Sequence, residues 1–448
     1  MEDARFVKIP ILPAETLLEG GGEFPLPRLV PVAQSFVGKR VTALEETLVT
    51  EFQRLKGLET LGPGASVAIA VGSRGITDIA RVVKALVEWL KERNFKPFIV
   101  PAMGSHGGPT AKGQTEILED YGISETTLGI PVRSSLEVIQ LGSTVGGVPV
   151  WFDWAAASAD GVIVVNRVKP HTDFSGEIES GLTKMLAIGL GKHRGASTIH
   201  SFGFGNLGRN IVEVARVIRS RVNVIGGIAI LEDAYKETAR VEVVPGHSLE
   251  EREKELLAEA RLMMPGLPVN DIDFLLVQYV GKDISGAGFD PNITGRRKIW
   301  NVSDFEHPNV SVMGVLDLSP GTHGNAAGVS IADIASRRVV EKMDFGATYA
   351  SLVTATLPQH AHVPMLCGTD REVVIVGTKI SRYEDPTRVR LCWIRDTSHI
   401  DRLWVSESLV AEVLQREGVE ILGAAREFPF LADGSLLWCE PGEKRLHL

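Results

Sequence analysis

Three short loops hold side chains that could move protons or bind anions. They are residues 72–75, 104–108 and 169–173, and each is rich in glycine, proline or polar residues. Each loop directly follows an apolar run that is typical of a buried parallel strand. Because ligands of open parallel sheets bind beyond the carboxyl ends of the strands, we expect one sheet to bring all three loops together at one edge.

Two of these loops contain histidines, which transfer protons near neutral pH. His106 lies among glycines that allow the backbone to approach a ligand. His171 follows Pro170, which restricts the backbone, and precedes Asp173, whose carboxylate could orient an imidazole. Both histidines are therefore candidates for acid–base catalysis. A histidine that only bonds to the loop backbone, or that caps the next helix, is an equally good interpretation of either pattern.

A lysine and two more histidines follow in a glycine-rich stretch. Lys184 lies in the apolar run 181–189, where desolvation would lower the pKa of its amine and make it nucleophilic. A lysine at a helix end that extends its amine to solvent is the alternative. His193 and His200 are seven residues apart, or two helical turns. One histidine cannot hold a metal unaided, and the sequence has no Cys/His box, so a zinc site built from protein ligands alone is disfavoured.

Other polar groups could bind an anion. Arg74 follows a predicted strand and could hold a carboxylate or phosphate, or form a surface ion pair. Farther along, Lys282 and His323 lie in glycine-containing loops that could equally be ordinary turns. Residues 203–208 have the glycine spacing of a dinucleotide-binding loop but follow no predicted strand, so this match is weak.

The order of apolar segments predicts an α/β fold. We expect strands at residues 66–71, 96–100, 161–165 and 222–231, and helices at residues 76–93, 110–121 and 207–220. Ser248 and Glu251 predict a capping box for one more helix. Pro265–Pro268 is the predicted linker. After it, we expect strands at 274–280, 312–316, 373–376 and 389–394, and helices at 345–357 and 407–416.

This pattern favours two domains, each built on a mainly parallel sheet flanked by helices, with the active site in the interdomain cleft. Residues 1–265 would form the cofactor-binding and catalytic domain. Residues 270–448 would form a substrate or lid domain, whose last helix could pack back on the first domain.

Composition limits the class of protein further. Hydrophobic residues make up 44% of the 448 residues, so a large core is possible, and the net charge of −9 argues against nucleic-acid binding. The sequence has neither a signal peptide nor an apolar run of about 18 residues, so no membrane segment is expected. Its three cysteines, Cys367, Cys392 and Cys439, form no pairing motif, which fits a reducing cytoplasm.

Taken together, the motifs resemble the nickel-dependent lactate racemase family. In the order of that family, the matching positions are Ser73-Arg74, Gly104-Ser105-His106, Pro170-His171, Lys184 and His200. The spacing from Lys184 to His200 also agrees, whereas the stretch from His171 to Lys184 is a few residues longer than in lactate racemase itself. The resemblance is good over roughly residues 65–210 and loose elsewhere.

The resemblance implies a nickel-pincer nucleotide, a nicotinate-derived mononucleotide that binds nickel through one carbon and two sulfurs. Lys184 would then tether the cofactor, Ser73 and Gly189 would help to bind it, and His200 would complete a planar nickel coordination. His106 and His171 would be two acid/base residues, one for each enantiomer. Arg74 would bind the substrate carboxylate, and Lys282 is the substrate contact expected from the second domain.

The implied reaction inverts C2 of a 2-hydroxy acid, by hydride transfer to the cofactor while a histidine takes the hydroxyl proton. Expected partners are this small acid and the proteins that assemble the cofactor, with neither nucleic acid nor membrane. One alternative is an NAD-dependent 2-hydroxy acid dehydrogenase, which would need a true dinucleotide fingerprint. The other is a non-catalytic protein that binds a nucleotide cofactor.

Overall fold

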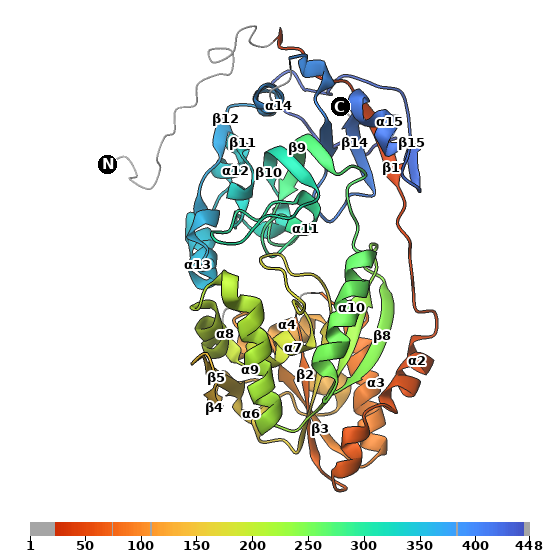
Figure 1. Ribbon diagram of the computed structural model, residues 1–448, viewed down its shortest axis with the longest axis vertical. Helices are drawn as coiled ribbons and strands as arrows, with labels where there is room; N and C mark the ends of the chain where they lie inside the picture. Colours follow the sequence, from red (N-terminus) through yellow and green to blue (C-terminus); the bar gives the residue numbers. More distant parts are fainter. Residues whose placement is uncertain (1–22, 74, 108–109, 382–383, 443–448) are drawn as a thin grey trace, which may run out of the picture. The chain divides into compact units, whose positions relative to one another are not determined.

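The computed structural model describes residues 23–73, 75–107, 110–381 and 384–442. The chain forms two compact units, drawn in Figure 1. One unit is the continuous segment Val37–Met264, which we call the central unit. The other, which we call the composite unit, combines Pro265 onward with the described residues before Val37.

The sheet of the central unit has the strand order β3-β2-β6-β7-β8. Its members are β3 (Lys96–Pro101), β2 (Ser66–Val71), β6 (Gly161–Arg167), β7 (Val224–Glu232) and β8 (Thr238–Pro245). The first four are parallel and β8 is antiparallel to β7. The strands are buried and rich in β-branched residues, as in a sheet covered on both faces. A mainly parallel sheet flanked by helices is thus confirmed for this unit.

Helices cover both faces of this sheet. Two of them, α2 (Leu44–Phe52) and α3 (Ile79–Glu92), share a core with one face. The segment Leu182–Leu190 and helices α9 (Leu207–Arg221) and α10 (Leu249–Met263) share a core with the other. The remaining elements of the unit are α4 (Ala111–Asp120), α5 (Glu125–Leu128), β4 (Val138–Ser143), β5 (Pro149–Asp153), α6 (Trp154–Ala157), α7 (Leu182–Lys184) and α8 (Lys192–His200).

The composite unit is built on an eight-stranded sheet in the order β12-β11-β10-β9-β13-β14-β1-β15. Its strands are β12 (Met365–Cys367), β11 (Ile334–Ser336), β10 (Asn309–Leu318), β9 (Asp271–Val280), β13 (Leu391–Ile394), β14 (Arg402–Ser406), β1 (Leu29–Gln34) and β15 (Val419–Ile421). The five from β12 to β13 are parallel, and the last three pair antiparallel. Its helices are α11 (Pro291–Thr294), α12 (Arg337–Glu341), α13 (Phe345–Ala355), α14 (Asp370–Ile380) and α15 (Val410–Val413).

The observed units differ from the expected domain 1–265 at the beginning of the chain. Strand β1 pairs with β14 on one side and β15 on the other, so it belongs to the composite unit. Leu29 and Val32 are almost fully buried there, and burial of this apolar surface explains why the strand joins that sheet. The last helix, α15, also lies within the composite unit.

Three local predictions were wrong. Residues 373–376, expected as a strand, lie in helix α14, which Thr369 and Glu372 begin with a reciprocal capping box. A short apolar run fits a buried strand and a buried helix equally well, and here the cap decides. Ser248 makes no cap hydrogen bond to α10, because its hydroxyl donates to the Pro245 carbonyl instead. Residues 407–416 form only a 3-10 turn followed by the single turn of α15.

None of the helices in the described ranges combines the length and hydropathy that crossing a bilayer requires.

Candidate active site

The three loops with candidate catalytic or anion-binding residues follow strands that end at one edge of the central unit's sheet. Strands β3, β2 and β6 are parallel neighbours, so the loops that follow them leave at the same edge. Ser73 Oγ lies 2.6 Å from Nδ1 of His106, which joins the first loop to the second. The N–H of Gly104 donates to the Gly189 carbonyl at 3.1 Å, which joins the second loop to the lysine-bearing segment. Arg74 lies outside the described residues.

The His106 loop is held by its own backbone. Gly104 and Gly107 have φ values of 60° and 76°, in the left-handed region that favours glycine. A Cβ at Gly107 would lie 2.7 Å from the Gln114 nitrogen, so the close approach of the loop to α4 also needs glycine. The Gln114 side chain donates to the carbonyls of Gly104 and His106, at 3.0 and 3.3 Å. The His106 ring is half-buried at the end of this loop.

The His171 loop has a different support. Nδ1 of His171 accepts the Asp173 backbone N–H at 2.9 Å, which assigns this nitrogen as the unprotonated one. The backbone N–H of Asp173 therefore orients the ring. The His171 backbone N–H donates to Glu179 at 2.6 Å, and the ring lies 4.4 Å from that of Phe174. Glu179 is almost fully buried and also pairs with Arg261 at 2.7 Å.

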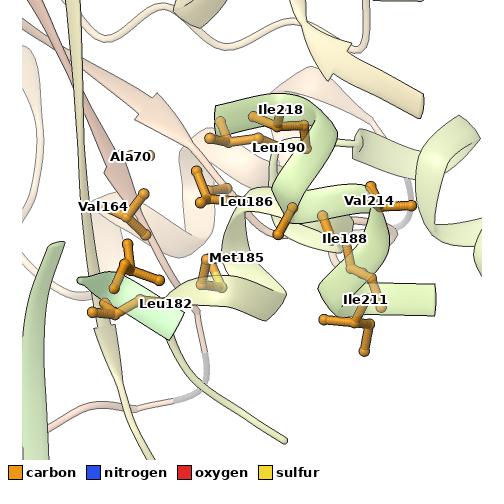
Figure 2. Close-up of a cluster of buried hydrophobic side chains, with 14 of the residues drawn as sticks. Ala70, Val164, Leu182, Met185, Leu186, Ile188, Leu190, Ile211, Val214 and Ile218 are labelled. Carbon is orange, nitrogen blue, oxygen red and sulfur yellow. The ribbon is translucent and has the colours of Figure 1, made fainter. Parts of the chain in front are cut away.

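Lys184 ends the short helix α7, which continues as a π-helical turn over Met185–Gly189. Single π turns are rare and often occur at functional sites. This segment is anchored by apolar side chains that pack between the sheet and α9 (Figure 2), including Leu182, Leu186 and Leu190. On a straight helix, residues 184 and 200 would be about 24 Å apart. Instead the chain turns at Lys192, whose φ is 55°, and α8 packs back on the π turn.

A buried carboxylate supports the start of the lysine-bearing helix. Glu253 of α10 accepts the backbone N–H of Thr183 at 2.8 Å and the Thr183 hydroxyl at 2.5 Å. Burial raises the pKa of Glu253 to about 7, against the opposing effect of the Thr183 hydrogen bonds. A methyl group at Gly181 would overlap the other carboxylate oxygen, which explains the glycine there.

His200 ends α8 and lies close to Lys184. Burial, followed by the positive charge of Lys184, lowers the pKa of His200 to about 4, while Asp173 acts in the opposite direction. The imidazole is therefore neutral at pH 7 and offers a nitrogen lone pair to a ligand. Its ring stacks on Phe204 at 5.9 Å. The charges of Lys184 and Asp173 both act on His200, so the lysine, this histidine and the His171 loop share one neighbourhood.

Several predicted site residues have other surroundings. His193 is exposed on α8. Gly189 is buried, and a Cβ there would lie 2.7 Å from the Ala102 carbonyl, so close packing favours a glycine at this position. The 203–208 motif follows helix α8 rather than a strand, and Gly208 packs on the Phe174 ring. Gly208 therefore has a packing role beside His171, and Gly203 has a left-handed φ of 83°.

The composite unit places Lys282 in its own loop, where the amine donates to the Gly286 carbonyl at 2.6 Å. His323 has a left-handed φ of 49° and is exposed. A cavity of about 450 Å³ lies elsewhere in this unit and is lined by Lys298, Trp300, Gln359 and His362, among others. Lys298, which also bonds to Asp333 at 2.8 Å, is thus a lysine at a cavity that sequence reasoning missed.

Within the described ranges, no three histidine, cysteine, aspartate or glutamate side chains gather in a way that could hold a metal ion. His200 could supply one nitrogen ligand, and any metal bound there would need its other ligands from a bound group.

The chain is similar to known proteins in sequence and in fold. A family described as a domain of unknown function (DUF362) matches residues 70–245. The chain is similar in fold to the lactate racemase apoprotein from Thermoanaerobacterium thermosaccharolyticum, with a TM-score of 0.50 and 13% identity over 82% of this chain and 94% of that one. A Thermotoga maritima protein from a structural genomics consortium gives a TM-score of 0.49 and 14% identity over 82% and 99% of the two chains. A search of curated proteins finds no match.

Proposed function

We propose that this chain is a racemase or epimerase that inverts C2 of a 2-hydroxy acid, with a nickel-pincer nucleotide as its cofactor. The observation that carries the proposal is the location of the His200 imidazole near Lys184, where burial, together with the charge of this lysine, lowers the pKa of His200. These two groups lie in the unit whose sheet edge also holds the loops of His106 and His171. The fold shared with a lactate racemase apoprotein supports the same function.

The residues fit such a cofactor. A group that already holds its metal through carbon and sulfur needs one more protein ligand, and a neutral histidine is a suitable one for nickel. His200 would be this ligand, Lys184 would form the covalent tether, and Ser73 would contribute a hydroxyl. When bound, the cofactor supplies a hydride acceptor for C2 of the substrate.

The side chains of this unit would handle the proton. His106 and His171 would each act as base for one enantiomer and as acid for the other, since inversion needs a proton acceptor on both sides of a flat 2-oxo acid. The tautomer of His171, with Nδ1 held by the Asp173 backbone, leaves Nε2 as the nitrogen directed to other groups. Arg74 is the proposed partner of the substrate carboxylate.

In the composite unit, we propose that Lys298 rather than Lys282 contacts an anionic substrate. Lys298 lines a cavity, where its amine also bonds to Asp333, whereas the Lys282 amine donates to the Gly286 carbonyl of its own loop. A Lys298→Met variant would then raise KM more than a Lys282→Met variant does.

The tether is tested by intact mass. Protein produced together with the cofactor-assembly enzymes should gain the mass of one nucleotide adduct, and Lys184→Ala should lose it. Lys112→Ala is the control, because Lys112 is an exposed lysine of the same unit. A wild-type mass that stays unmodified under these conditions would refute the covalent role. Turnover of NAD(H) without nickel would favour the dehydrogenase alternative, and cofactor binding without turnover of any chiral 2-hydroxy acid would favour a carrier.

A further inference from the structure

Lys192 is fully buried at the start of α8. Its amine donates to the Pro101 carbonyl at 2.5 Å and to Gln114 Oε1 at 3.3 Å, and it lies 3.3 Å from Asp153 Oδ2. A buried ammonium group is costly unless it is paired and hydrogen-bonded. The position of Lys192 is therefore tied to the ends of β3 and β5 and to α4.

One of these contacts leads directly to the His106 loop. Gln114 is fully buried, and its nitrogen donates to the carbonyls of Gly104 and His106 while its oxygen faces Lys192. A lysine amine can only donate, so it fixes which end of the amide faces the loop. Without Lys192, the amide of Gln114 could rotate and present its oxygen to the loop carbonyls.

Asp153 provides the opposite charge. It is fully buried, and its Oδ1 accepts the Ala156 N–H at 2.7 Å, which caps helix α6. Burial raises the pKa of Asp153 and lowers the pKa of Lys192, and the attraction between the two groups opposes both shifts. The carboxylate is thus held in place by the helix start and holds the amine in turn.

We propose that Lys192, Gln114 and Asp153 form a positioning network that fixes His106 relative to the helix bearing His200. The inference rests on the proposed function, in which His106 moves a proton and His200 binds the cofactor. Lys192 is sealed from solvent, so it acts through Gln114 and not on the substrate. A shift of about 1 Å in a reacting group can lower a rate by a factor of about 100.

Two variants disrupt the network without leaving an unpaired buried charge. Lys192→Met/Asp153→Asn removes both charges and keeps an oxygen to cap α6, and Gln114→Met removes the amide. Arg252→Met is the matched control, because it breaks a partly buried ion pair with Glu242 in the same unit. In the holoenzyme, we expect the two network variants to lower kcat at least tenfold, with KM within twofold and the Lys184 adduct intact. Arg252→Met should keep kcat.

Hydrogen exchange of the backbone amides of residues 102–107 gives a second readout that needs no cofactor. We expect exchange at least tenfold faster in both network variants, with strands β7 and β8 unchanged. If the wild-type protein shows neither adduct nor turnover, the proposed function fails and the exchange rates alone decide on the network. Loop exchange as slow as in the wild type, or a lowered Tm with an unchanged kcat, would overturn the proposal.

Discussion

At the scale of single residues, the two loop histidines make the most direct prediction. If His106 and His171 each move the hydroxyl proton, His106→Ala and His171→Ala should each slow interconversion at least about 100-fold, since a positioned acid or base contributes that much or more. Nickel content should stay unchanged, because neither ring is the proposed ligand. The measurement is chiral chromatography of each enantiomer incubated with holoenzyme, together with metal analysis.

His193→Ala is the control for this experiment, since His193 is an exposed histidine on the same helix as His200. It should keep full activity. Full activity in either loop variant would instead remove that histidine from the mechanism.

The sequence indicates the residues of the proposed site better than those that support them. His106 and His171 stand out as histidines in loops after predicted strands, and Lys184 and His200 stand out as reactive residue types in or near a glycine-rich stretch. Glu179, Lys192 and Glu253 do not stand out, because a charged residue in a polar-looking segment is normally exposed. Their burial depends on partners distant in sequence, such as Thr183 for Glu253, and these pairs arise only when the chain folds.

At the scale of elements, Glu253 links the stability of the lysine-bearing helix to pH. Its folded pKa of about 7 lies above the ordinary value of 4.5, so the unfolded chain releases the proton first as pH rises. The free energy of unfolding should then fall between about pH 4.5 and pH 7, by about 3 kcal/mol from this group, and level off above. The stabilising contribution is therefore fully present only at the acidic end of this window.

Glu253→Gln keeps an oxygen for Thr183 and removes the titration. Urea unfolding at pH 5 and pH 8 should show a smaller loss of stability for this variant than for the wild type. Equal pH dependence in the two proteins would show that the carboxyl group titrates near its ordinary value. Glu250→Gln is a useful comparison, because ion pairing with Arg216 lowers the pKa of Glu250 and its titration should act in the opposite sense.

Elements were predictable where their pattern was long. The fourteen-residue helix α3 carries a clear apolar face, and strand β2 was predicted at its observed bounds, Ser66–Val71. The sequence did not distinguish a strand from a helix at residues 373–376, because four apolar residues fit both. The pair Thr369 and Glu372 was the available signal for α14, and it outweighs β-branched composition because it satisfies two backbone donors at the helix start.

At the scale of the whole molecule, the chain order and the spatial order differ. The central unit is one continuous segment, whereas the composite unit needs a strand from the beginning of the chain. The sequence alone suggests a domain boundary at Pro265–Pro268. It gives no sign that residues 29–34 pair with strands more than 360 residues away. Such pairing depends on which open sheet edge is available, and local patterns do not encode it.

This arrangement predicts that a destabilising substitution in β1 lowers the stability of the composite unit alone. Val32 is fully buried in β1, whereas Val37, five residues later, is 80% exposed. Val32→Asp would bury a carboxylate among apolar side chains and should destabilise the composite unit by at least about 3 kcal/mol. Val37→Asp makes the same chemical change and should alter stability by less than about 0.5 kcal/mol.

Hydrogen exchange resolved by peptide separates the two units in the intact chain. In Val32→Asp, amides of β9, β10 and β14 should exchange faster while those of β2, β6 and β7 keep wild-type rates, because the latter strands form a different core. Faster exchange in both sets of strands would mean that the units unfold together. Unchanged exchange in β14, the direct neighbour of β1, would mean that the strand contributes little to its sheet.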